Sequence, residues 1–335
     1  MSVRVIDAGV VTAVRSQALW HGLAEAMRPG EEPVLSLCTP GEPYVCLGYH
    51  RRMDEIDPHA CAAQGVPVLR RQIGGGPVFL DSDQLFFGLT IPAAGAPAQV
   101  DRLYARLLEP ACAALRGLGV EARIVGTNDI VAGGRKISGT GAGRIGEGVV
   151  VVGNVMFAFA HERMAEILRV PDESMRAECL ALMREHLGTL PELRPDAVKT
   201  ALIDAYAAEF GEARSGALRA RERSAIAGWE RRMRDPDWVA GPTLGPRPGR
   251  QVKIRAGVWV YDHRADDVHV RVRVEDGRVR RASVAAHSFN GGAAKIAEAL
   301  VGANARVQEL AERLQDFGDD GARVLDALAP GLVVR

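Results

Sequence analysis

Apolar and polar residues alternate in short runs along the first 160 residues, and segments with helical spacing separate these runs. Alternation and β-branched residues predict strands at residues 4–11, 33–39, 43–50 and 66–73. Apolar residues at helical spacing predict helices at residues 13–28, 53–65 and 100–119. Residues 120–139 and 147–160 each predict a strand, a glycine turn and a second strand, and a helical block follows from about 162 to 235.

A change of composition divides the chain near residue 243. The segment GPTLGPRPGR at 241–250 holds three prolines and three glycines, which favours a linker. Residues 253–286 alternate as a three-stranded meander would, with Asp276 and Gly277 as a hairpin turn, and helices close the chain. We therefore expect an α+β fold with mixed sheets flanked by helices over residues 1–243. Residues 244–335 are expected to form a small α+β accessory domain.

The composition excludes several classes of protein. The net charge of the 335 residues is zero, so no overall field favours a nucleic acid or an anionic membrane as partner. No run of about 20 apolar residues and no signal-peptide pattern is present, which indicates a cytoplasmic protein. The five cysteines form no CxxC pair and the histidines no HExxH motif, so neither a disulfide framework nor a zinc site is expected.

The segment RRQIGGGPVFLD at 70–81 is the first candidate for chemistry. Three consecutive glycines let the backbone turn and let a ligand approach it closely, and exposed amide groups in such a turn suit phosphate or carboxylate oxygens. Arg70 and Arg71 alternate across a strand, so one is expected to face the site and the other to face outward. Neither a Walker A loop nor a Rossmann fingerprint fits, because a strand follows Pro77. The alternative is a plain hairpin with solvated arginines.

The segment GTNDIVAGGRKISGTGAG at 126–143 is the second candidate. Asn128 and Asp129 open a strand, and a glycine turn returns the chain through Lys136 to Ser138 and Gly139. The chain has 38 arginines and only four lysines, so a lysine here stands out. Its compact ammonium can contact a carboxylate and a phosphate together. A plain hairpin with a surface lysine remains the alternative.

The third candidate, VVVVGNVMF at 149–157, is an apolar strand broken by Gly153 and Asn154. A buried core strand is one interpretation, and a glycine that makes space for an apolar ligand tail is the other. Together the three segments suit a reaction that joins a carboxylic acid with an apolar tail to a nucleotide phosphate. Fixed cations and N–H dipoles, helped by Mg²⁺, would stabilise the negative charge that develops.

The order of these motifs, RRxxGGGxVxxD, then NDI, then GxKISG and a GxxxF strand, resembles the lipoate–protein ligases. That family shares its catalytic fold with biotin ligases and octanoyltransferases. The resemblance implies that ATP and lipoate, or octanoate, give an acyl-adenylate and pyrophosphate, with Mg²⁺ present. The acyl group then passes to a lysine of an apo lipoyl domain, such as an H-protein-like or E2 domain, and the enzyme is expected to be a monomer.

The resemblance also implies roles for individual residues. Lys136 corresponds to the catalytic lysine that contacts the lipoyl carboxylate and the adenylate phosphate, and Asp129 to a residue near phosphate or Mg²⁺. The other positions implied in binding ATP and the adenylate are Arg71, Gly74, Gly75, Gly76, Pro77, Val78, Phe79, Asn128, Ser138 and Gly139. Those implied beside the lipoyl tail are Arg70, Gly153 and Asn154.

The chain departs from the family pattern at three places near the site. Leu80 stands where a histidine is common, Gln84 replaces a frequent asparagine, and Asn154 follows the glycine where HGT is usual. One alternative function is an octanoyl or lipoyl transfer through a cysteine thioester, but neither region where those relatives carry the cysteine contains one here. A non-catalytic lipoyl-binding homologue is the other. Biotin ligase is a weaker rival, because GAGRIGEG follows the lysine rather than preceding it.

Overall fold

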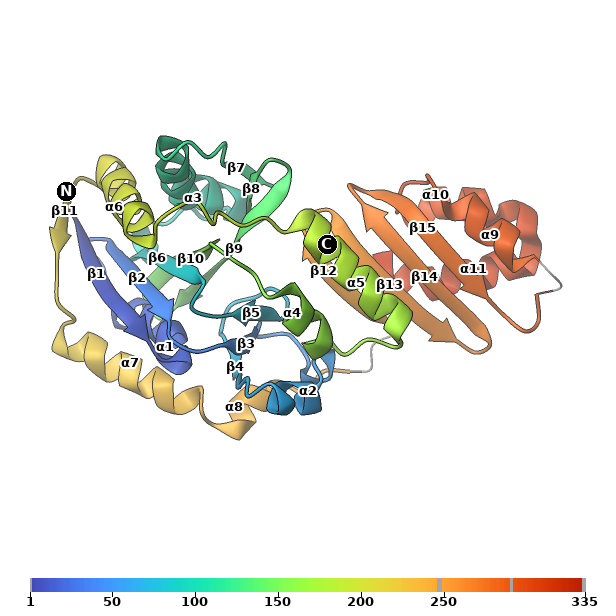
Figure 1. Cartoon of the computed structure of the whole chain (residues 1–335), viewed down its shortest axis with the longest axis horizontal. Helices are drawn as coiled ribbons and strands as arrows, with labels where there is room; N and C mark the ends of the chain where they lie inside the picture. The colour runs from blue at the N-terminus through green and yellow to red at the C-terminus, as the bar shows by residue number, and fades with distance from the viewer. Residues whose placement is uncertain (1, 246–248, 290–291, 333–335) are drawn as a thin grey trace. The chain divides into compact units, whose positions relative to one another are not determined.

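A computed structural model describes residues 2–245, 249–289 and 292–332 (Figure 1). The chain forms two compact units, the first from Met1–Arg169 and Met183–Thr243, the second from Val170–Leu182 and Leu244–Arg335. The segment 170–182, which the sequence pattern placed with the first domain, therefore packs with the second unit. We keep residues 1–243 and 244–335 as proposed domains, with this segment as the exception.

An eight-stranded sheet forms the centre of the first unit. Two neighbouring pairs at one edge are parallel and the remaining pairs are antiparallel. In spatial order its strands are β11 (Glu212–Ser215), β1 (Ser2–Val11), β2 (Val34–Pro40), β6 (Gln84–Pro92), β10 (Gly148–Met156), β9 (Arg135–Ile145), β8 (Asp129–Ala132) and β7 (Arg123–Val125). A three-stranded sheet has the order β4 (Val68–Arg70), β3 (Tyr44–Leu47) and β5 (Val78–Leu80).

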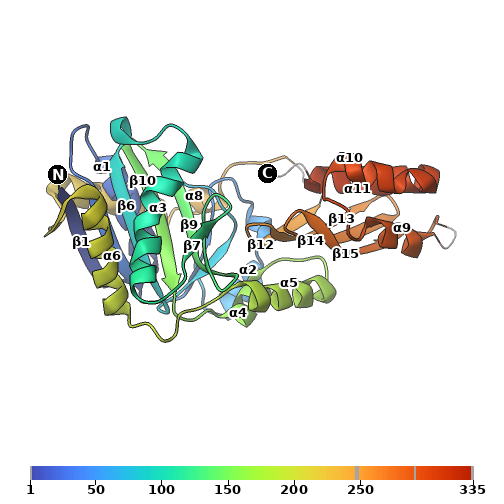
Figure 2. The same cartoon turned by 90° about the horizontal axis from the view of Figure 1, so that it is seen from above.

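Helices cover both faces of the large sheet, because alternate strand residues are apolar on each side. Leu37, Phe87 and Val151 pack on one face with α3 (Val100–Gly117) and α6 (Pro195–Phe210). Figure 2 shows these two helices lying over the strands. Phe86 and Val150 point to the other face, toward α1 (Ala13–Ala26) and α7 (Ala220–Arg232). The first unit also contains the helices α2 (Pro58–Ala63), α4 (His161–Ile167) and α8 (Pro236–Ala240). Helix α5 (Glu173–His186) begins in the second unit and ends in the first.

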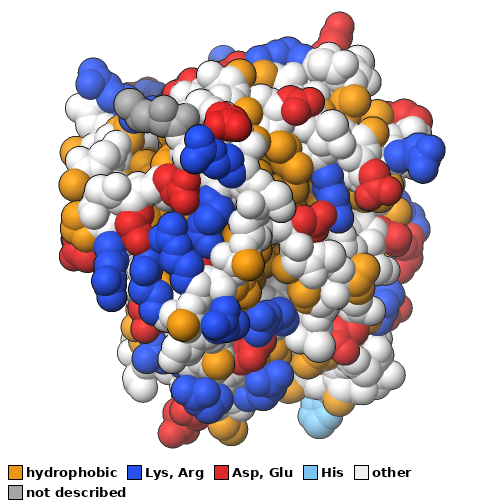
Figure 3. Space-filling view, turned by 90° about the vertical axis from the view of Figure 1, so that its left-hand side faces the viewer, with side chains coloured by type: hydrophobic (Ala, Val, Ile, Leu, Met, Phe, Trp, Pro, Cys, Tyr) orange, Lys and Arg blue, Asp and Glu red, His pale blue; other side chains and the backbone are white. Residues whose placement is uncertain are grey.

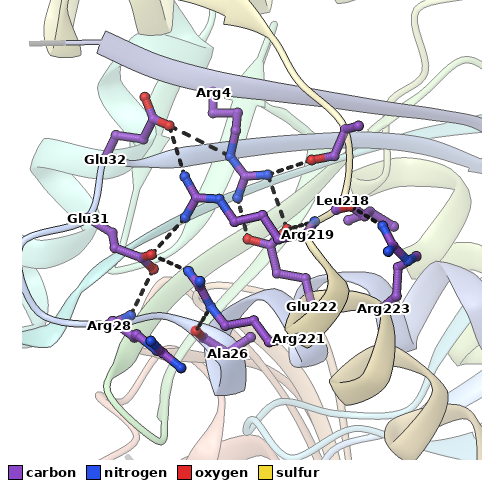
Figure 4. A network of polar contacts seen from close by, with 11 residues as sticks. Arg4, Ala26, Arg28, Glu31, Glu32, Leu218, Arg219, Arg221, Glu222 and Arg223 are labelled. Atoms are coloured by element: carbon purple, nitrogen blue, oxygen red, sulfur yellow. Dashed lines mark hydrogen bonds and ion pairs between the residues drawn. The ribbon is translucent and has the colours of Figure 1, made fainter.

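A network of ion pairs fastens the start of α7 to the edge of the sheet (Figure 4). The guanidinium of Arg4 in β1 contacts the buried carboxylate of Glu222, and Arg219 bridges Glu31 at 2.7 Å and Glu32 at 3.3 Å. Figure 3, which views the molecule from the left-hand side of Figure 1, shows blue side chains gathered on one part of the surface with red carboxylates beside them. The arginines of the network therefore neutralise neighbouring carboxylates, and we assign them to the fold.

The second unit is a four-stranded antiparallel sheet with helices. Its strands are β12 (Arg250–Arg255), β13 (Val258–Ala265), β14 (Val268–Glu275) and β15 (Arg278–Ala285), and its helices after the sheet are α9 (Ala293–Leu300), α10 (Val307–Leu314) and α11 (Gly318–Leu332). Val270 and Val272 face these helices in the core. On the other side, Arg271 joins Asp262 and Asp172, which precedes α5, at 2.7 and 2.6 Å.

The α+β class is confirmed, and four details of the pattern-based prediction were wrong. The meander has four strands, not three, because a turn at residues 256–257 separates β12 from β13. The predicted helix at 53–65 is divided by Pro58, and its second part, α2, begins at the Asp57 cap. Residues 148–156 form one continuous strand. The polar segment 212–215 within the predicted helical block is strand β11, which no apolar alternation marks.

The Asp276–Gly277 turn is confirmed, since both residues have positive φ angles of 47° and 80°. Residues 246–248 of the predicted linker lie outside the described part of the chain. Within that part, no helix is both long and apolar enough to cross a membrane.

Candidate functional site

The glycine turn at 74–76 is held from within by Arg71. The guanidinium of Arg71 donates to the carbonyl oxygens of Cys46 at 2.8 Å, Gly74 at 2.9 Å and Gly76 at 3.0 Å. Gly75 has a φ of 104°, and a Cβ there would lie 2.5 Å from Nη2 of Arg71. Glycine is therefore required at this position both by its backbone angle and by the arginine. Because Gly74 and Gly75 remain exposed, the turn presents bare backbone to solvent.

The turn also rests on two groups from other elements. The backbone N–H of Gln72 donates to Nε2 of His21 in α1 at 3.0 Å, and Nδ1 of His21 contacts the carbonyl of Gln17 at 2.7 Å. Burial lowers the pKa of His21 to about 3, so its ring is neutral and Nε2 can accept the hydrogen bond. Gly48 approaches so closely that a Cβ would lie 2.2 Å from the carbonyl oxygen of Gly75. Neither residue was singled out from the sequence.

Neither Arg70 nor Arg71 faces outward, although strand alternation predicted that one of them would. Arg70 is fully buried and donates to five backbone carbonyl oxygens, three of them in the loop after β3 and two in α8. Its distances to these oxygens range from 2.6 to 3.0 Å. Strand alternation failed here because β4 ends at Arg70, so Arg71 lies beyond the regular ladder. Both arginines therefore organise the backbone, and all three guanidinium nitrogens of Arg70 donate to backbone carbonyls.

A β-bulge aims Lys136 at the carboxylate of Asp129. Regular pairing of β8 with β9 would place Lys136 opposite Ala132, but a register shift of one residue places it opposite Val131. Lys136 thereby shares a face with Asp129 and Gly139, and its Nζ lies 2.8 Å from Oδ1 of Asp129. Bulges commonly redirect a side chain next to an active site. The expected turn between these strands is present, with Gly133 and Gly134 at positive φ.

Gly139 forms the floor beneath the lysine. A Cβ on Gly139 would lie 3.5 Å from Cε and 3.6 Å from Nζ of Lys136. The N–H of Gly139 donates to Oδ1 of Asn154 at 2.8 Å. Asn128, beside Asp129, donates from Nδ2 to the carbonyl of Thr140 at 2.7 Å. Four of the predicted residues, namely Lys136, Asp129, Gly139 and Asn154, are thus brought together.

A stripe of glycines along β9 joins the lysine to the glycine turn. Gly139, Gly141 and Gly143 alternate and so share one face of the strand. Ile73, which precedes the turn, packs onto this stripe: Cβ atoms on Gly141 and Gly143 would lie 2.7 and 2.6 Å from its side chain. The segment that carries the turn is therefore in direct contact with β9. The contact begins at Gly141, two residues beyond Gly139. The sequence pattern did not single out Gly141, Gly143 or Ile73.

Gly153 and Ser138 face away from this stripe. A Cβ on Gly153 would lie 2.5 Å from the ring of Phe87, so the glycine makes room for a core aromatic residue. Ser138 is fully buried opposite Ile130 in the ladder, on the other side of β9 from Gly139. Phe79 is also buried, and its carbonyl accepts a hydrogen bond from Gln84 at 3.2 Å.

The residues around Asp129 do not form a protein-built magnesium site. The carboxylate of Asp129 is buried and one of its oxygens contacts the ammonium of Lys136. In residues 2–245, 249–289 and 292–332, no group of three or more His, Cys, Asp or Glu side chains could hold a metal ion. Mg²⁺ often binds one or two carboxylates and completes its shell with substrate phosphates and water. A magnesium ion here would therefore depend on a bound triphosphate.

The comparison with known sequences places these residues in a family. The model of the lipoyl protein ligase A/B catalytic domain matches residues 13–210, more than half of the chain. The lipoate-protein ligase LplJ of Bacillus subtilis is 29% identical over 48% of this chain and 47% of its own length. The octanoyltransferase LipM of Moorella thermoacetica is 25% identical over 68% of this chain and 97% of its own. The chain thus matches about half of the length of LplJ.

Solved structures share the fold at low sequence identity. The bipartite lipoate protein ligase of Thermoplasma acidophilum, solved in a study with its E2 lipoyl domain, gives a TM-score of 0.68 at 20% identity and covers 73% of this chain. The match extends over 99% of the length of the Thermoplasma chain. A lipoate-protein ligase A bound with ATP gives 0.63 at 20% identity over 72% of this chain and 99% of its own. LipL1 of P. falciparum, in complex with lipoate, gives 0.55 at 13% identity over 97% of each chain. With its glycine turn and bulged lysine strand inside the matched range, the chain belongs to the lipoyl protein ligase A/B catalytic domain family.

Proposed function

We propose that this protein is an ATP-dependent lipoate–protein ligase that activates lipoate or octanoate and transfers the acyl group to a lysine of a lipoyl domain. One observation carries the proposal. The ammonium of Lys136 is held by a buried carboxylate over a glycine floor, on the strand against which the glycine turn packs. This arrangement offers a fixed cation and bare backbone to a negatively charged mixed anhydride.

In the first step, a carboxylate oxygen of the acid attacks the α-phosphorus of ATP. A new P–O bond forms, the bond to the β-phosphate oxygen breaks, and pyrophosphate leaves. Negative charge accumulates on the phosphoryl oxygens, and the ammonium of Lys136 is placed to stabilise it. The ATP-bound relative supports a nucleotide in this fold.

In the second step, the neutral amine of the acceptor lysine attacks the acyl carbon of the adenylate. An amide bond forms, the bond to AMP breaks, and the amine loses a proton. The relative studied with its E2 lipoyl domain supports an acceptor of that class. We also propose that Arg71 and the residues of the turn, 74–77, bind the adenylate through the exposed backbone.

Two further functions are possible for this family. An octanoyltransferase that passes the acyl group through a cysteine thioester of its own would need a thiolate nucleophile. All five cysteines are buried, and burial raises the pKa of each thiol, to about 12 for Cys38, Cys112 and Cys179. A lipoyl-binding protein without activity could carry arginine at position 136, as the chain does at nearly every other cationic position. These observations favour the ligase.

The test compares acyl donors with one preparation of the protein. We expect lipoate and ATP to modify an apo lipoyl domain, with pyrophosphate released, and an octanoyl-carrier thioester without ATP to give no product. Lipoate-dependent exchange of labelled pyrophosphate into ATP would isolate the first step. Modification from the thioester alone would instead establish the transferase, and lipoate binding without pyrophosphate release would establish the binding protein.

A further inference from the structure

Two positions at which the chain departs from the family pattern, Gln84 and Asn154, contact one another. Nδ2 of Asn154 donates to Oε1 of Gln84 at 2.5 Å. Gln84 is fully buried in β6, and Asn154 in β10 is 8% exposed. Neighbouring strands β6 and β10 place both side chains on the face that carries the glycine stripe. The two departures therefore form one structural unit rather than two separate losses.

The pair connects the lysine strand to the strand that leaves the glycine turn. At one end, Oδ1 of Asn154 accepts the N–H of Gly139 at 2.8 Å. At the other, Nε2 of Gln84 donates to the carbonyl of Phe79 in β5 at 3.2 Å and lies 3.4 Å from Oδ1 of Asp81. The chain of hydrogen bonds thus runs from β9 through two buried amides to β5.

The backbone groups at the two ends fix the direction of this chain. Gly139 can only donate through its N–H, and the Phe79 carbonyl can only accept. Each side chain between them must therefore accept on one side and donate on the other, which an amide does and a carboxylate does not. The same reasoning assigns the amide orientations without ambiguity between oxygen and nitrogen.

Gly139 is also the residue on which the lysine depends for its position. It lies opposite Asp129 in the β8–β9 ladder, and the Lys136 side chain passes over its Cα. A shift of Gly139 would therefore move the backbone under the Lys136 ammonium. It would also disturb the strand pairing that holds Asp129, the partner of that ammonium. In a packed interior such shifts are transmitted rather than absorbed.

We propose that Asn154 and Gln84 are positioning residues: through Gly139 they hold the Lys136 ammonium at a fixed distance from the glycine turn. The expected effect on the rate of adenylate formation rests on the proposed function, whereas the expected effect on the position of Lys136 does not. Asn154 then positions Lys136 and does not itself contact the reacting atoms.

Three variants separate the links of the chain. Asn154→Asp keeps the acceptor for Gly139 and removes the donor to Gln84, and Gln84→Glu keeps the acceptor for Asn154 and removes the donor to Phe79. Asn154→Leu removes both links and leaves the Gly139 N–H unpaired. Gln251→Glu, an amide-to-carboxylate change in the second unit, is the matched control.

The first readout does not need activity. The chain has four lysines, so reductive methylation with a ¹³C label gives a small set of side-chain signals, with Lys136 assigned from Lys136→Arg. We expect the Lys136 signal to shift in all three variants, most in Asn154→Leu, while those of Lys199, Lys253 and Lys295 stay unchanged. If Asn154→Leu does not fold, the two carboxylate variants decide the outcome.

The second readout is the rate of adenylate formation. We expect kcat to fall at least about tenfold, with the KM for ATP changed by less than about twofold, because the lysine acts as charge develops. Unchanged Lys136 signals in folded variants, or equal shifts of all four lysines, would overturn the inference. A wild-type protein that makes no adenylate would refute the proposed function, and the lysine signals would still decide the positioning.

Discussion

The ammonium nitrogen of Lys136 lies 2.8 Å from Oδ1 of Asp129, a carboxylate with a side chain only 2% exposed. This relationship exists because a bulge inserts one extra residue into β9 between Lys136 and Gly139. Without the bulge, the lysine would point to the opposite face, toward the core. A single irregularity of the backbone thus decides on which side of the sheet the candidate chemistry takes place.

Lys136→Ala is expected to lower the rate of adenylate formation by about a hundredfold or more, because it removes a fixed cation from the developing charge. The free energy of unfolding should also fall, because the buried carboxylate of Asp129 loses its cation, so the rates are compared under conditions in which both proteins are folded. The matched control is Lys199→Ala, since Lys199 is 19% exposed and pairs with Asp7 at 3.0 Å. Pyrophosphate exchange and urea unfolding measure both effects. An unchanged rate of adenylate formation in the folded Lys136→Ala protein would identify a structural lysine instead.

Replacement of Arg70 and of Arg71 should lower the free energy of unfolding by different amounts. Arg70→Lys leaves buried carbonyls in two elements without donors, so we expect a loss of about 3 kcal/mol in the free energy of unfolding. Arg71→Lys leaves the buried carbonyl of Cys46 in need of a donor, but water can replace the guanidinium at the exposed Gly74, so it should cost about 1–2 kcal/mol. The KM for ATP should rise at least about tenfold in Arg71→Lys. Equal stability losses in the two variants would contradict this division.

His21 should make the protein less stable in acid. The unfolded histidine takes up a proton near pH 6.5, whereas the buried ring takes it up only at a pKa of about 3. Between these values the unfolded state binds more protons, so stability falls as the pH falls, by up to about 1.4 kcal/mol per pH unit from this group. His21→Gln, which cannot titrate, should show a shallower slope in urea unfolding across this window. Parallel slopes would show that His21 is not the group responsible.

Gly153→Ala should destabilise the core rather than weaken substrate binding. The added methyl group would meet the ring of Phe87, an overpacking that costs about 1–3 kcal/mol. In the double variant Gly153→Ala, Phe87→Leu, the smaller side chain should recover part of that loss, so the two effects would not add. Urea unfolding of the four proteins measures the coupling. An increase in the KM for lipoate with unchanged stability would instead support a position of Gly153 beside the lipoyl tail.

The thiols should be inert in the folded protein. Because burial raises the pKa of all five cysteines, iodoacetamide is expected to leave both the native protein and its activity unchanged. In denaturant all five thiols should react, which controls for the reagent. Loss of activity on alkylation of a single cysteine would support a thioester mechanism.

Much of the fold was accessible from alternation and turn chemistry. The strands around Leu37 and Phe87 carry apolar residues that the sheet buries, and the turns at 133–134 and 276–277 contain the glycines that positive φ requires. Strand β11 was missed because its burial is slight, and parallel pairing with β1 gives it its place. Local pattern contains no information on such long-range pairing.

At the site, residue types were predictable but directions were not. The sequence pattern identified Lys136 and Asp129, yet strict alternation would not place Lys136 on the same face as Gly139. Bulges have weak local signals, so the face of Lys136 follows from the ladder as a whole. For the same reason the link from Asn154 to Gln84, 70 residues apart, could only be seen in three dimensions.

Helix α5 has a practical consequence for truncation experiments. Residues 173–182 of this helix pack with the second unit, while its last residues, 183–186, belong to the first. A protein ended after Thr243 would therefore keep the helix but lose its packing partner, and would present Met175 and Cys179 to water. Loss of activity in such a truncated protein would report damage to α5 as readily as a catalytic contribution of the removed segment. A cleaner deletion would also redesign these two apolar side chains.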